Sequence, residues 1–206
     1  MFRKTLPISL ARSVAFGALF PARKVMLCGE GAYGLAHYVT ARAACERRRV
    51  RFICGDNRFD PYAISRFARS KKLRPEAALR SILIARAFTA YQMSELVNRL
   101  DPSISDLVII SGPCSTYFDE DVSITDAARL FYRTLWRMVE LARSGMTLLL
   151  VQSETPAGTR RAHFLTDLCR ASDVVLRLAG QHTFSIEGRP RQALDQITPE
   201  DRTEGD

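Results

Sequence analysis

The sequence has no apolar run close to the ~20 residues that a helix needs to cross a bilayer, so its pattern excludes a transmembrane protein and a membrane partner. Paired cysteine spacing of the metal-binding or redox kind is also absent from its five cysteines, which are Cys28, Cys45, Cys54, Cys114 and Cys169. We therefore expect free thiols, a cytoplasmic location and no metal site. The three histidines share no motif with a nucleophile such as Cys114 or Ser115, which argues against hydrolase or transferase chemistry.

The 206 residues suit one domain, and the apolar fraction of 47% fits a folded globular protein. We expect an N-terminal arm over residues 1–23, a core domain over 24–190 and an acidic, disordered tail over 191–206. The net charge of +8 gathers in basic runs within residues 42–51 and 66–74. Such runs fit either a nucleic-acid partner or a solvated helix face.

Short apolar runs alternate with amphipathic segments along most of the chain. The runs, which predict strands buried on both faces, are residues 25–28, 50–54, 81–85, 107–111, 147–151, 174–178 and 182–187. The amphipathic segments, which predict helices, lie near residues 35–48, 62–72, 91–100, 126–143 and 160–171. This alternation predicts an α/β fold with a mostly parallel central sheet and helices on both of its faces.

The first of these runs leads into the glycine-rich stretch "GEGAYGLA" over residues 29–36. Read as G-x-G-x-x-G, with Gly29, Gly31 and Gly34, it is a dinucleotide fingerprint, and Asp56 follows at close to the ~20 residues expected for a ribose-binding carboxylate. Read as G-x-x-x-x-G-K-[ST], the phosphate-binding motif, it has Leu35 in place of the lysine and Ala36 in place of the hydroxyl residue. Taken alone, the stretch favours the dinucleotide interpretation.

Residues 55–97 favour the other interpretation, because they resemble the core of the RecA/RadA family of recombination ATPases. The residues that carry this resemblance are Asp56, Phe59, Pro61, Leu73, Pro75, Ala85, Arg86, Ala87, Phe88 and Gln92. The similarity extends less specifically over about residues 24–188. It implies a RecA-like P-loop NTPase core with degenerate Walker A and Walker B motifs.

The resemblance also implies that the catalytic groups are missing. The nucleotide-binding positions carried over are Gly29, Glu30, Gly31, Ala32, Tyr33, Gly34, Leu35 and Ala36. The magnesium-linked aspartate is replaced by Ser111, and Asp56 stands as a relic of the water-orienting glutamate. Because phosphoryl transfer depends on such charged groups, we expect no ATP hydrolysis and no required cofactor, leaving weak ATP or ADP binding by loop amides as an open alternative.

The family's DNA-contacting loops are altered as well. The first is acidic here, "YFDEDVSITD", and the second is short, leaving Arg160 and Arg161 as the DNA-binding candidates. The resemblance implies an inactive RecA/RadA-like paralogue, a recombination or repair accessory protein that binds a protein partner, either a RecA-like homologue or itself, and single-stranded DNA. Two alternatives remain: a nucleotide- or dinucleotide-binding protein that uses residues 29–34 with Asp56, and a structural subunit of a heteromeric RecA-like assembly.

Overall fold

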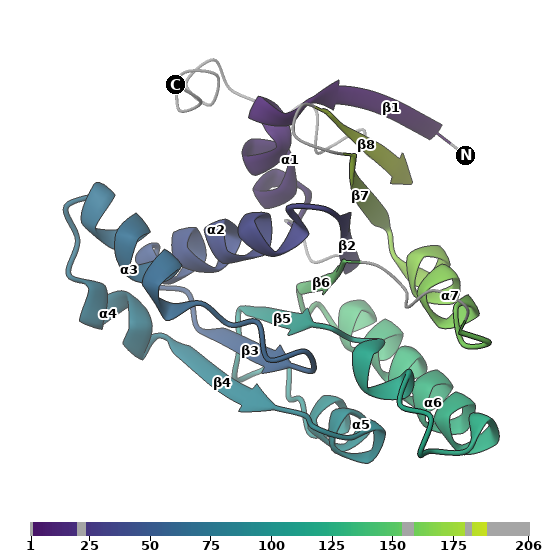
Figure 1. Ribbon diagram of the computed structural model, residues 1–206. Helices are drawn as coiled ribbons and strands as arrows, with labels where there is room; N and C mark the ends of the chain where they lie inside the picture. Colours follow the sequence, from purple (N-terminus) through teal and green to yellow (C-terminus); the bar gives the residue numbers. More distant parts are fainter. Residues whose placement is uncertain (1, 20–23, 154–158, 180–182, 189–206) are drawn as a thin grey trace.

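The computed structural model describes residues 2–19, 24–153, 159–179 and 183–188, and it is an α/β fold built on one eight-stranded sheet (Figure 1). The strands are β1 (Phe2–Pro7), β2 (Lys24–Gly29), β3 (Val50–Cys54), β4 (Ile82–Arg86), β5 (Leu107–Ser111), β6 (Leu148–Gln152), β7 (Val174–Ala179) and β8 (Thr183–Gly188). The helices are α1 (Ala11–Ala18), α2 (Ala32–Cys45), α3 (Pro61–Ser70), α4 (Pro75–Arg80), α5 (Ala90–Asn98), α6 (Ile124–Arg143) and α7 (His163–Ala171). Short 3₁₀ turns, η1 (Ile8–Leu10) and η2 (Ser115–Tyr117), complete the elements.

The strands lie in the order β1-β8-β7-β2-β6-β5-β3-β4. The six from β7 to β4 are parallel, and β8 and β1 add antiparallel pairs at one edge. The carboxyl ends of the parallel strands therefore meet at one edge of the sheet, which is where open α/β sheets place their ligands. The expected α/β class and mostly parallel sheet are confirmed.

Alternation along each buried strand builds a separate hydrophobic core on each face. In β2, Val25 and Leu27 pack with α1, α2, α3 and α4, whereas Met26 and Cys28 pack with α5, α6 and α7. Both faces are covered, which is why these strands read as continuous apolar runs. Helices on both faces were expected, and this too is confirmed.

All seven strands expected from the apolar runs are present, within one or two residues of their predicted ends. The sequence analysis gave no strand for β1 and no helix for α1 or α4, and β1 and α1 lie within the expected N-terminal arm. Val14 and Ala15 of α1 are fully buried in the core over α2, and β1 pairs with β8. The predicted tail, residues 191–206, lies outside the described residues. Among the described residues, no helix is long and apolar enough to cross a membrane.

Candidate functional site

The carboxyl edge of the sheet holds the glycine stretch beside β2. Helix α2 follows β2 on one face of the sheet, whereas α7, which follows the neighbouring strand β6, packs on the other face. Open α/β sheets commonly bind ligands at such a point, where the connections that follow two neighbouring strands leave to opposite faces of the sheet. The residues around this point therefore form the candidate site.

The turn between β2 and α2 is short. Strand β2 ends at Gly29 and α2 begins at Ala32, with Gly31 as its N-cap. Both glycines have positive φ, +92° for Gly29 and +85° for Gly31, and a Cβ atom on Gly29 would lie 2.1 Å from the Leu178 carbonyl oxygen of β7. This close approach to β7 is enough to require glycine at position 29, whether or not a ligand binds.

The early start of α2 changes what the stretch can bind. The Leu35 N–H donates to the Gly31 carbonyl at 3.1 Å as an ordinary helical bond, so it is not free to hold a phosphate. Leu35 and Ala36, at the positions where the phosphate motif needs lysine and a hydroxyl, are buried in the core over α2. The N–H groups of residues 32–34 at the helix start have no acceptor among the described residues.

The dinucleotide interpretation meets a different obstacle. In the classical dinucleotide fold the first two strands are neighbours, whereas here β6 and β5 lie between β2 and β3. Asp56, just after β3, is therefore about 14 Å from the line of β2 at ~4.8 Å per strand. Gly34, the third fingerprint glycine, makes no close packing, because a Cβ atom there would meet nothing within 4 Å.

Asp56 forms hydrogen bonds with residues near the carboxyl ends of β3 and β5. Its Oδ1 atom accepts a hydrogen bond from the Ser111 hydroxyl at 2.7 Å and one from the Arg58 N–H at 3.3 Å. Its Oδ2 atom is buried and has no hydrogen-bond partner among the described residues. Ser111 thus stands where the resemblance calls for a magnesium ligand, and its hydroxyl donates to the Asp56 carboxylate.

Tyr33 reaches from the first turn of α2 toward this carboxylate. Burial first, and then the neighbouring Asp56, raises the pKa of the Tyr33 phenol well above its usual range, so the hydroxyl remains protonated. The guanidinium carbon of Arg58 lies 4.7 Å from the Tyr33 ring centroid. The Tyr33 ring, the Asp56 carboxylate and the Arg58 guanidinium therefore lie close together beside the start of α2.

His37, which follows Ala36, has a structural role. Its Nε2 atom accepts a hydrogen bond from the Asp60 N–H at 3.0 Å, and its ring stacks 6.1 Å from that of Phe52. Burial lowers the pKa of His37, so the imidazole is neutral near pH 7 and cannot replace the missing lysine.

The two DNA-binding candidates separate clearly. Arg160 is exposed, whereas Arg161 is buried and its guanidinium donates to the backbone carbonyls of Tyr117, Asp119 and Val122. Arg161 therefore holds the segment after β5 in place and does not face solvent. The basic character of the sequence gave no signal that would distinguish these adjacent residues.

A basic groove, which the sequence indicated only as scattered charges, lies between α1, α2 and α3. We call it the α1–α3 groove; it has a volume of about 670 Å³, and its lining includes Arg12, Tyr38, Asp60, Arg66, Phe67 and Lys71. The Arg12 guanidinium lies over the Tyr38 ring at 5.1 Å and the Lys71 ammonium over the Phe67 ring at 5.9 Å. Three cations here face a single carboxylate.

That carboxylate, Asp60, already has hydrogen-bond and ion-pair partners within the protein. Asp60 caps α3 by accepting from the N–H groups of Tyr62 at 2.8 Å and Ala63 at 3.1 Å, and it pairs with Arg66 at 3.5 Å. The described lining of the α1–α3 groove thus has three basic side chains, one acidic side chain and two aromatic rings, and basic side chains with aromatic rings are the combination found in grooves that follow nucleic-acid backbones.

Nucleophile and metal chemistry find no support in the described part of the chain. Cys114 is fully buried, which raises the pKa of its thiol far above its usual range, and its N–H donates to Gln152. No group of three or more His, Cys, Asp or Glu side chains there could hold a metal ion.

No protein-family model matches the chain, and a search of curated proteins finds no similar sequence.

Proposed function

We propose that this protein is a RecA/RadA-like core without ATPase activity that acts as an accessory or regulatory protein in DNA recombination or repair, through a protein partner and DNA. The stretch that resembles the recombinases, residues 55–97, forms one continuous unit from the end of β3 through α3, α4 and β4 to α5. The separation of β2 from β3 by two strands further supports this proposal over a dinucleotide-binding protein.

The observation that carries the loss of catalysis is the composition of the carboxyl edge. Leu35 and Ala36 are core residues. Ser111 has no carboxylate that could bind magnesium, and its hydroxyl donates to Asp56. Loss of one preorganised charge-stabilising donor commonly lowers a rate by about 100- to 1000-fold. Loss of the lysine and both metal-binding groups together leaves no measurable turnover.

Contact with DNA is assigned in this proposal to the α1–α3 groove rather than to Arg161. The cations of this groove are exposed, and two of them, Arg12 and Lys71, lie over aromatic rings. The Arg161 guanidinium instead donates to backbone carbonyls. The protein partner is a RecA-like homologue or a second copy of the chain.

Residual nucleotide binding is the second candidate, because the N–H groups of residues 32–34 at the start of the 14-residue helix α2 have no acceptor among the described residues. Glu30 and Asp56 oppose it, since both carboxylates would repel phosphates. A ligand present at 100 times its dissociation constant stabilises a protein by ~2.7 kcal/mol, so a melting experiment with ATP, ADP, NAD and NADP tests it directly.

The main experiment measures magnesium-dependent ATP turnover and, in parallel, the strand-exchange rate of the recombinase from the same cell with and without this protein. We expect turnover at the level of a no-protein blank and a changed strand-exchange rate. Turnover above the blank would overturn the loss of catalysis. An unchanged strand-exchange rate over a titration of the protein would overturn the accessory role.

A further inference from the structure

The two edges of the sheet are protected to different degrees. At one edge β1 carries the exposed Lys4 and Pro7, which are common devices against unwanted strand pairing. At the other edge β4, with the sequence ILIAR, contains neither lysine nor proline. Figure 1 shows β4 as the outermost strand, with α5 beside its end.

The hydrogen-bonding groups on the open side of β4 can be assigned from its pairing with β3. The Val50 N–H donates to the Ser81 carbonyl and the Ala87 N–H to the Cys54 carbonyl, both at 2.9 Å. In a parallel ladder alternate residues point toward the same neighbour, so Leu83 and Ala85 also face β3. The N–H and C=O groups of Ile82, Ile84 and Arg86 therefore face outward.

Large apolar side chains lie near these backbone groups, which have no partner among the described residues. Leu83 is 59% exposed, Ile84 46%, Phe88 69% and Tyr91 54%. We call these residues the β4 edge patch. Exposed apolar side chains next to an unpaired edge are typical of surfaces that another strand covers.

We propose that β4 of one copy pairs antiparallel with β4 of a second copy about a twofold axis at Ile84, which joins the two sheets and buries the β4 edge patch. The outward groups of Ile82, Ile84 and Arg86 are spaced by two residues, as an antiparallel ladder requires. In this register Ile84 lies opposite Ile84 of the second copy, and Leu83 lies opposite Ala85.

Charge favours this occupant over a head-to-tail array of copies. The twofold places each Arg86 opposite Ile82, so the two Arg86 residues lie about 13 Å apart along the strands at ~3.3 Å per residue. Pairing β4 with β1 of another copy would instead bring Arg86 toward the basic strand that contains Lys4. A twofold contact is also closed, whereas a head-to-tail contact gives open arrays.

This inference gives a surface to the second-copy partner named above, but it does not rest on the proposed function, because it uses no residue of the carboxyl edge and none of the α1–α3 groove. It holds equally for a protein that binds a nucleotide and for one that does not.

The first test measures the mass of the full chain in solution by light scattering over a range of concentrations. We expect the wild type at twice the 23.2 kDa chain mass and Ile84→Pro at the monomer mass. Proline at this position removes an outward N–H and leaves the ladder to β3 intact, as edge strands tolerate. Leu83→Lys is a second variant that keeps the backbone, and Trp136→Ser, an exposed apolar residue on α6, is the control that should remain dimeric.

The second test fixes the register by cysteine cross-linking. Ile84→Cys should form a disulfide with the second copy under mild oxidation, because residues opposite each other in a hydrogen-bonded pair have Cα atoms about 5.5 Å apart, within disulfide range. Leu83→Cys, opposite Ala85, should not cross-link to itself. A monomeric wild type, a dimer that survives both Ile84→Pro and Leu83→Lys, or cross-linking at Leu83 but not at Ile84 would each overturn the proposal.

Discussion

His37 lies in the second turn of α2 with its Nε2 atom 3.0 Å from the Asp60 nitrogen, which belongs to the N-cap residue of α3. The ring is buried and accepts this bond only as the neutral imidazole. One side chain therefore joins α2 to the start of α3, at the back of the α1–α3 groove.

This burial gives a pH-dependent stability. Burial lowers the pKa of His37 in the folded protein below the ~6.5 of an unfolded chain. As the pH falls below ~6.5 the unfolded state binds a proton that the folded state resists, so stability is lost at a slope of up to about 1.4 kcal/mol per pH unit. Urea unfolding at pH 7 and pH 5 should show this loss in the wild type and a smaller one in His37→Gln, and equal losses would contradict it.

At the residue scale the sequence itself shows that the positions of Leu35, Ala36 and Ser111 hold no lysine and no carboxylate. It did not predict that Tyr33 reaches Asp56 or that Arg161 is buried. Those facts depend on how strands distant in the sequence are ordered in the sheet, and no local pattern records that order.

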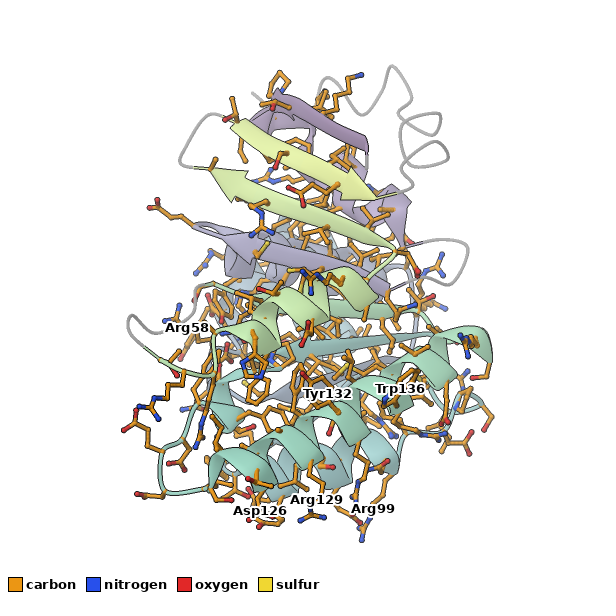
Figure 2. All side chains as sticks on the ribbon, turned by 90° about the vertical axis from the view of Figure 1, so that its right-hand side faces the viewer. Arg58, Arg99, Asp126, Arg129, Tyr132 and Trp136 are labelled. Carbon is orange, nitrogen blue, oxygen red and sulfur yellow. The ribbon has the colours of Figure 1, made fainter. Side chains whose placement is uncertain are left out.

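At the scale of elements, the segment after β5 depends on a single side chain from the start of α7. The Arg161 guanidinium donates to three backbone carbonyls, including that of Tyr117 at 2.9 Å, and Tyr117 in turn packs against Phe131 and Phe164. Figure 2 views this side of the molecule, with Tyr132 and Trp136 labelled on α6. Arg161 thus connects α7 to the connection that leads into α6.

Arg161→Ala should lower the free energy of unfolding by about 3 kcal/mol, because it leaves buried carbonyl groups without a donor. Arg160→Ala, the exposed neighbour, should change it by less than about 0.5 kcal/mol. Chemical denaturation of both variants measures the difference. Equal effects from the two substitutions would show that Arg161 does not hold this segment.

Elements with strong local patterns were predicted well and those without were missed. The buried parallel strands read as continuous apolar runs, and α6, whose N-cap is Ser123, has clear helical periodicity. Strand β1 mixes charged and apolar residues because it is an edge strand, and α4 has only six residues. Neither is long enough or regular enough for periodicity to reveal it.

At the scale of the whole molecule, the charge of +8 is not spread evenly. Arg12 comes from α1 and Arg66 from α3, far apart in the sequence, and the fold brings both to the α1–α3 groove with Lys71. On the opposite face of the sheet, Arg129 on α6 is neutralised by Asp126 at 3.1 Å (Figure 2). The fold therefore gathers basic side chains from distant parts of the sequence into one groove.

We predict that Arg66→Glu with Lys71→Glu weakens binding to a fluorescent single-stranded oligonucleotide by at least about tenfold at low salt and reduces the salt dependence of binding. Arg129→Glu with Arg133→Glu, which changes the net charge equally on α6, is the matched control and should cost much less. Fluorescence anisotropy at two salt concentrations measures both. Similar losses in the two double variants would mean that overall charge, not the groove, attracts the oligonucleotide.

The contact of Gly29 with β7 has an evolutionary consequence. A side chain at Gly29 would collide with the Leu178 carbonyl oxygen whether or not any nucleotide is present. Selection for folding alone would therefore keep this glycine in descendants that never bind phosphate. Its persistence in a lineage would report on the tight turn, and a search that scores glycine spacing alone would count such descendants as nucleotide-binding proteins whether or not they bind a nucleotide.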